Sequence, residues 1–225
     1  MSLGAIHKTV FKADGVLWFL GWIHIFLGFA CLCTAPWDYR QAFSTALWLK
    51  AAKYSAVTVL YAWTIAWILR YLPQPVWAKR LIRWGIVFTM LTVTACLILQ
   101  AGRGVVAHRE TSTPFDGYVL IVMVSALISN ALLALLLMFQ MLWQEVDLPS
   151  AYLGGMVAGL ASFMVGCAVG VYSLLQILDA ANAFRPPPDL RLLHVGCLIG
   201  LPLAPWIGHL LSGTAVAEAP APNRS

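Results

Sequence analysis

The sequence predicts an all-α fold, a polytopic transmembrane helical bundle of about six spans. Hydrophobic residues make up 61% of the 225 residues and charged residues only 10%, whereas about a quarter of the residues in a soluble protein are charged. The mean hydropathy is +0.81, and the apolar runs approach the length of about 20 residues that crosses a hydrocarbon core of about 30 Å. We therefore expect the lipid bilayer to surround nearly the whole chain.

Six apolar runs, separated by short polar segments, are the predicted spans. They cover residues 16–34, 46–69, 84–99, 117–143, 151–178 and 190–212. The run 16–34 is too long and too aromatic for a cleaved signal peptide, so it is expected to remain as the first span. The predicted domains are therefore an N-terminal segment, 1–15, a membrane domain, 16–212, and a disordered tail, 213–225.

Proline, glycine and charged residues mark where the predicted spans end. Pro36 ends the first span, and the connector between the second and third spans contains two prolines and several basic residues. Gly102 and Gly104 break the chain after the third span, and Pro114 restarts order before the fourth. A short acidic connector precedes the fifth span, and Pro202 bends the last one.

The basic connector, residues 70–83, decides the predicted orientation. Short basic loops stay in the cytoplasm, which places both termini, including segment 1–15, on the cytoplasmic side of a cell inner membrane. With this connector included, the Lys and Arg residues counted over the two sides are equal in number, so the orientation rests on the concentration of basic residues in this short connector. No basic run resembles a nucleic-acid patch, so the bilayer and not nucleic acid is the expected partner.

Two polar islands, residues 100–118 and 179–194, interrupt the apolar pattern and lie on one side of the membrane if the spans alternate. We predict that they and the start of the second span form a one-sided, periplasmic polar cluster. Its members are Lys53, Gln100, Arg103, His108, Asp116, Arg191 and His194. Asp116 is expected to pair with Arg103 or Arg191, because charges near lipid are normally paired. The alternative is that these side chains only cap helices and contact headgroups.

Two polar residues lie deep inside predicted spans. His24 is ionisable and near the middle of the first span, which makes it a functional candidate, although a neutral imidazole can also bond to a neighbouring polar group. Asn130 lies in the middle of the fourth span, where an interhelical hydrogen bond is its expected role.

Several of these polar stretches resemble an uncharacterised family of bacterial multi-pass membrane proteins. The matching stretches are Lys53-Tyr54, Gln100-Ala-Gly-Arg103-Gly104-Val-Val-Ala-His108, Thr113-Pro114-Phe-Asp116 and Leu190-Arg191-Leu-Leu-His194. The chain departs from that pattern at Arg109-Glu110, where the family has Phe-Asn. Ile199 and Pro202 also stand near positions where the family has His and Gln. The resemblance implies a shared polar site and brings no activity with it.

Three functions are left open by the residues. The polar cluster can bind a small solute, an ion or a lipid headgroup, as part of a transport path. Alternatively, His108 and His194, which are expected at similar depth, can hold a metal or ligate haem b, giving a membrane redox protein.

The third function is that of a non-catalytic subunit or scaffold. A ridge of small residues on the fifth span would then pack against a second copy of the chain or a partner helix. The ridge consists of Gly154, Ala158, Ser162, Gly166 and Gly170. No nucleophile elbow, zinc-protease motif, phosphate-binding glycine loop or suitably spaced acid pair occurs, so no catalytic residue is predicted and an enzyme is disfavoured.

Overall fold

The computed structural model describes residues 12–39, 44–72, 76–105, 113–144, 146, 148–179 and 188–211. Within these ranges the side chains of 44–46, 76, 170–171, 173–179 and 188–198 are outside the description. The predicted segment 1–15 falls outside it up to residue 11, and the tail falls outside it entirely.

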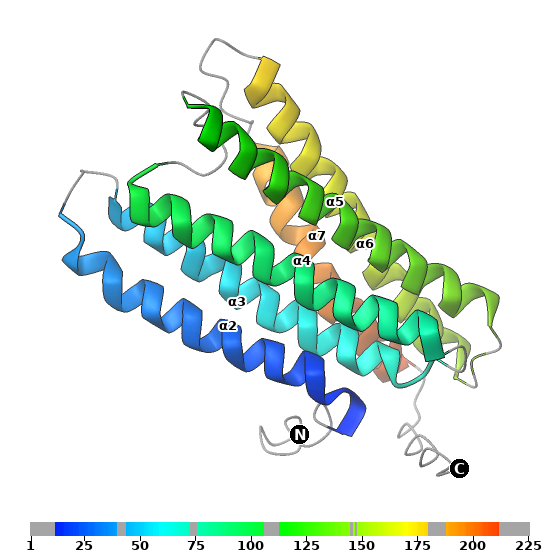
Figure 1. The fold of residues 1–225 in the computed structure, drawn as a ribbon. Coiled ribbons are helices and arrows are strands. Elements are labelled where there is room, and N and C mark those ends of the chain that lie inside the picture. The colour runs from blue at the N-terminus through cyan, green and yellow to red at the C-terminus, as the bar shows by residue number, and fades with distance from the viewer. Residues whose placement is uncertain are drawn as a thin grey trace.

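The described residues form a helical bundle without strands, which confirms the predicted fold class (Figure 1). The helices are α2 (Gly15–Thr34), α3 (Ser44–Leu69), α4 (Val76–Arg103), α5 (Pro114–Trp143), α6 (Ser150–Asp179) and α7 (Pro188–Leu211), with a 3₁₀ turn, η1 (Ala35–Trp37), after α2. Five of them are long and apolar enough to cross a membrane, and α7 contains the shorter apolar stretch Ile199–Leu211. The chain is therefore an integral membrane protein.

Successive helices run in opposite directions through the bundle (Figure 1). α2 packs mainly against α3, α4 lies against α3 and α5, and α6 packs most extensively against α7. We call the end at which α4 ends and α5 begins the α4–α5 end. α7 also begins at that end, so the topology places the starts of both predicted polar islands together.

The predicted start of the third span is wrong, because α4 begins at Val76 and not at residue 84. Its first two turns contain Lys79, Arg80 and Arg83. Long basic side chains at a helix end can extend to the headgroups while the backbone stays helical. A span boundary placed at the first uncharged run therefore misses these turns.

The other end of α4 is also longer than predicted. Gly102 lies inside the helix, which ends at Arg103, and only Gly104 breaks it. α5 begins at Pro114 and not at residue 117, so Asp116 belongs to its first turn. The predicted island is thus partly helical, and its described polar residues lie where α4 ends and α5 begins.

The predicted small-residue ridge of α6 does not form one face. Gly154 and Ala158 are exposed, whereas Gly166 is buried and Ser162 lies against Gly200 of α7. Residues four apart are about 40° out of register at 3.6 residues per turn, so a four-residue repeat winds around the helix. The side chain at Gly170 is outside the described part of the chain.

Glycines on both helices make the close contact between α6 and α7, and the two on α6 are Gly155 and Gly159. A Cβ on Gly155 would lie 2.5 Å from the carbonyl oxygen of Ala204, and one on Gly159 would lie 2.7 Å from that of Leu201. Both obstacles are backbone atoms, so these positions admit only glycine at this helix separation. The small residues on this face of α6 are therefore used within the chain.

Candidate functional site

A buried carboxylate lies at the α4–α5 end. Asp116 is only 1% exposed and sits in the first turn of α5. Thr113 is the N-cap of α5: its Oγ1 accepts a hydrogen bond from the Asp116 backbone N–H at 3.2 Å and donates one to Asp116 Oδ2. The helix dipole also favours a negative charge in this turn. The local sequence thus holds the carboxylate in one orientation.

Two side chains from the last turn of α4 complete the cluster around Asp116. Gln100 is fully buried, and its Nε2 donates to Asp116 Oδ1 at 3.0 Å. Arg103 Nη1 donates to Gln100 Oε1 at 2.7 Å and forms an ion pair with Asp116 Oδ1. The predicted pairing of Asp116 with Arg103 is therefore confirmed. We call Gln100, Arg103, Thr113 and Asp116 the Asp116 cluster.

The backbone at the end of α4 determines that Gln100 and Arg103 lie in the last turn of the helix. Gly104 has a φ of 74°, its N–H donates to the carbonyl of Ala101 at 3.0 Å, and the N–H of Val105 donates to that of Gln100 at 2.9 Å. This pair of bonds is a Schellman motif, which satisfies the last carbonyls of the helix and needs a left-handed residue at this position. It fixes Arg103 as the final residue of α4.

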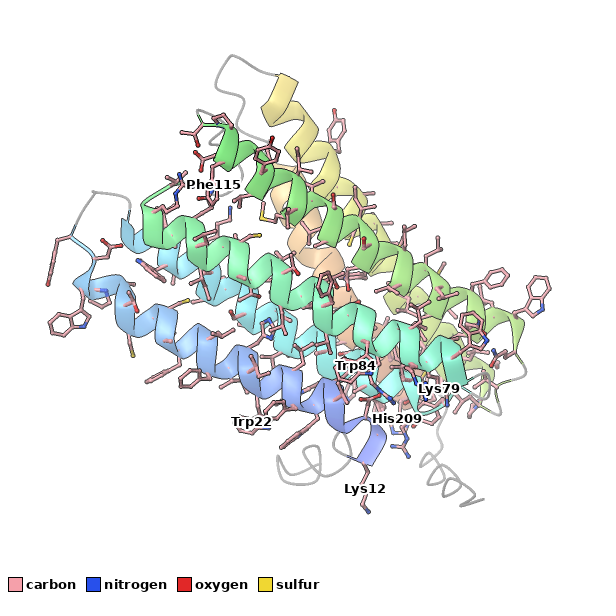
Figure 2. The ribbon with its side chains drawn as sticks, in the orientation of Figure 1. Lys12, Trp22, Lys79, Trp84, Phe115 and His209 are labelled. Carbon is pink, nitrogen blue, oxygen red and sulfur yellow. The ribbon has the colours of Figure 1, made fainter. Side chains whose placement is uncertain are left out.

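The Arg103 guanidinium is held on one side and open on the other. Its Cζ lies 4.6 Å from the centroid of the Phe115 ring, and the side chain is 34% exposed. Arg103 donates both of its hydrogen bonds, to Gln100 and to Asp116, through Nη1. Its Nε and Nη2 make no hydrogen bond to the described part of the chain. Figure 2 shows Phe115 at the α4–α5 end, with Lys79 and His209 at the opposite end.

Of the other predicted site residues, only Lys53 has a described side chain. Lys53 is exposed on α3, on the same strip as Val57 and Leu60, and no hydrogen bond or ion pair joins it to the Asp116 cluster among the described residues. His108 lies outside the described residues. The side chains of Arg191 and His194 also lie outside the described part, although their backbone belongs to the first turns of α7.

Thr113 was missed as a site residue by the sequence reasoning. Thr113-Pro-Phe-Asp116 places a threonine three residues before an acid, directly ahead of an apolar run. That spacing is the signature of a capping box, in which the two side chains and the helix N-terminus bond to one another. The pattern was therefore sufficient to add Thr113 to the cluster.

His24 in the middle of α2 has both ring nitrogens occupied. It is fully buried; Nδ1 donates to the carbonyl of Leu20 and Nε2 accepts from the Thr94 hydroxyl, each at 2.9 Å. The interpretation of His24 as a hydrogen-bonded imidazole therefore fits the structure. Neither nitrogen can ligate iron or another metal without breaking one of these bonds.

The described histidines do not fit an axial pair for haem b. His209, the other one whose side chain is described, lies at the opposite end of the bundle, next to Tyr152. Within the described ranges no group of three or more His, Cys, Asp or Glu residues could hold a metal ion. The predicted pairing of His108 and His194 around haem or a metal lies outside that part of the chain and stays a prediction.

Replacing His24 with leucine is expected to lower the free energy of unfolding by about 1–2 kcal/mol, because one interhelical hydrogen bond is lost inside the membrane. The effect should be smaller in a background that already carries Thr94→Val, since the hydroxyl partner is absent there. Unfolding titrations of the four proteins of this double-mutant cycle measure the coupling. Strictly additive effects would show that the bond contributes nothing.

Asn130 makes the predicted interhelical contact between three helices. Its Oδ1 accepts from the hydroxyl of Tyr61 on α3 at 3.0 Å and from that of Thr89 on α4 at 3.4 Å. Asn130 is itself 1% exposed. Small polar groups of this kind stabilise membrane bundles without being ligand sites. The Asp116 cluster, in which the Arg103 side chain is partly exposed, is the better candidate for function.

No protein-family model, curated protein or solved structure matches the chain. The chemistry of the Asp116 cluster therefore has to be judged from its own contacts. A carboxylate that accepts three side-chain bonds stays ionised, and the arginine beside it keeps two nitrogens for another acceptor. Such an arginine can bind an anion, and phosphate and carboxylate groups match its planar fork.

Proposed function

We propose that this protein binds a small anionic ligand, a solute or a lipid headgroup, through Arg103 at the α4–α5 end of the bundle. The observation that supports the proposal most strongly is that the Arg103 side chain is both fixed in position and partly exposed. Gln100, Asp116 and Phe115 hold it in place, yet a third of it remains exposed at 34%. A fixed and accessible guanidinium is a preorganised anion site.

Gln100 distinguishes this arrangement from an ordinary surface ion pair. Its amide bonds to both charged partners, with Oε1 on Arg103 and Nε2 on Asp116. An arginine that only reaches toward the headgroups needs no such buried bridge. The bridge fixes the guanidinium relative to the carboxylate, which lowers the ordering cost of binding a ligand.

The depth of Arg103 favours a ligand at the membrane surface. α4 has 28 residues, which corresponds to a length of about 42 Å, longer than the hydrocarbon core of about 30 Å. Arg103 is its last residue and so lies at headgroup level. His108, Arg191 and His194 belong to the same end by chain position, and Arg191 would add positive charge around the ligand.

The proposed setting is a bacterial inner membrane, with the α4–α5 end on the periplasmic side. The order of the polar stretches around Gln100, Asp116 and His194 supports it through the resemblance to bacterial multi-pass proteins. The basic first turns of α4 lie at the opposite end, where the positive-inside rule places the cytoplasm. Transport of the ligand would be a further step beyond binding.

Calorimetric titration with glycerol 3-phosphate, in a detergent without phosphate, tests the proposal. Arg103→Gln should weaken binding by about tenfold or more, because charge-assisted hydrogen bonds contribute about 1.5–3 kcal/mol. Arg80→Gln is the matched control, since Arg80 is an exposed arginine at the opposite end of α4. Equal affinity of the wild type and Arg103→Gln, or no binding by the wild type, would contradict the proposed function.

A further inference from the structure

A groove of about 500 Å³ lies between α2 and α4. Its lining is almost wholly apolar, with one hydroxyl. The lining residues are Leu27 of α2 and Leu91, Thr94, Ala95, Ile98 and Leu99 of α4. Because both helices cross the membrane, the groove faces the acyl chains of the bilayer.

The groove exists because α2 and α4 are joined at two points and packed loosely elsewhere. Near the end of the bundle opposite the α4–α5 end, Asp14 at the start of α2 pairs with Arg83 of α4 at 2.6 Å. Halfway along, His24 bonds to Thr94 at 2.9 Å. Over its whole length α2 packs mainly against α3 and makes few contacts with α4. Thr94, which bonds to His24 from α4, also belongs to the groove lining, and the lining extends past it to Leu91.

The α4 side of the groove leads toward Arg103. Ala95, Leu99 and Arg103 follow one another at four-residue spacing, so each side chain is offset by about 40° around the helix from the one before it. From Leu91 to Leu99 the helix rises about 12 Å, and Arg103 lies about 6 Å further along the axis. The lining of the groove thus ends at Leu99, about one helical turn before Arg103.

We propose that the anionic ligand is a phospholipid, with its phosphate on Arg103 and an acyl chain in the groove between α2 and α4. This inference rests on the proposed function, since it names the ligand of the same site. A soluble phosphate would satisfy Arg103 and leave the apolar groove unused, whereas a phospholipid matches the guanidinium and the groove together. The position of Arg103 at headgroup depth also favours a phospholipid, because its phosphate lies at that depth.

Filling the groove separates the two proposals. Ala95→Phe places a large side chain in the groove, away from the Asp116 cluster, and Ala56→Phe is the matched control on the exposed strip of α3. Native mass spectrometry with added long-chain phosphatidylglycerol measures lipid retention. We expect about tenfold weaker retention by Ala95→Phe and by Arg103→Gln, and no change with Ala56→Phe.

Binding of glycerol 3-phosphate is the second readout, because this probe has the phosphate and no acyl chain. Ala95→Phe should bind it like the wild type, which also shows that the fold is intact. If Ala95→Phe disturbs both ligands, the smaller Ala95→Leu is judged by the same criterion. Unchanged lipid retention in the groove variants, with loss in Arg103→Gln, overturns the phospholipid inference alone. Unchanged binding of both probes in Arg103→Gln overturns the proposed function as well.

Discussion

Replacing Gly159 with leucine is expected to lower the free energy of unfolding by about 3 kcal/mol or more, at the upper end of overpacking effects. A Cβ at this position would lie 2.7 Å from the carbonyl oxygen of Leu201 and 3.1 Å from Cδ of Pro205. The first of these is backbone, which cannot rotate away as a side chain can. The variant can fold only if α6 and α7 move apart, and this is the most extensive helix pair of the bundle.

Gly154→Leu is the matched control for this prediction. Gly154 is on the same helix, and a Cβ there meets no atom within 4 Å. Its replacement should change stability by less than about 0.5 kcal/mol. Thermal denaturation in detergent and size-exclusion profiles of the two variants make the comparison. Equal stability of Gly159→Leu and Gly154→Leu would show that the close approach of α6 and α7 is not required for folding.

Replacing Asp116 with alanine is expected to lower the free energy of unfolding by about 2–4 kcal/mol. The substitution removes the acceptor used by Gln100, Arg103 and the Thr113 hydroxyl. Gln100 is fully buried and would keep an unsatisfied amide, whereas Arg103 is partly exposed and can turn to water. This exposure keeps the expected effect below that of a fully buried ion pair.

Reversible unfolding in mixed micelles measures this change. Asp116→Asn should fall between the wild type and Asp116→Ala, because its carbonyl can still accept from Gln100 while the charge is lost. Thr113→Val should cost about 1 kcal/mol through loss of the N-cap. A change below about 0.5 kcal/mol in Asp116→Ala would mean that the cluster does not stabilise the junction of α4 and α5.

Much of the fold follows from hydropathy, because each helix presents lipid with an apolar surface and alternation fixes which ends lie together. The same signal misplaces helix ends, as the basic first turns of α4 show. The pairing of Asp116 with Arg103 was predictable from charge and chain position, since an acid near lipid needs a cation. The bridging role of Gln100 depends on how the two helices face each other, which periodicity does not determine.

Side-chain direction accounts for the remaining differences. Lys53 was grouped with the polar cluster from its depth in the second span, but the strip of α3 that it shares with Leu60 faces outward. The groove between α2 and α4 had no counterpart in the sequence, because it depends on where two helices diverge and not on their composition. In the sequence, the residues that line the groove cannot be distinguished from other apolar residues on the helix surfaces. The groove becomes visible only when the positions of both helices are known.

Solid-state NMR of the protein in phospholipid bilayers shows directly whether Arg103 binds a phosphate. The experiment measures dipolar coupling between the ¹⁵N nuclei of labelled arginine and the lipid ³¹P. We expect a coupled guanidinium signal in the wild type and in Arg80→Gln that disappears in Arg103→Gln. Identical coupled signals in the wild type and Arg103→Gln would show that Arg103 binds no lipid phosphate. Its guanidinium would then serve only as the partner of Asp116.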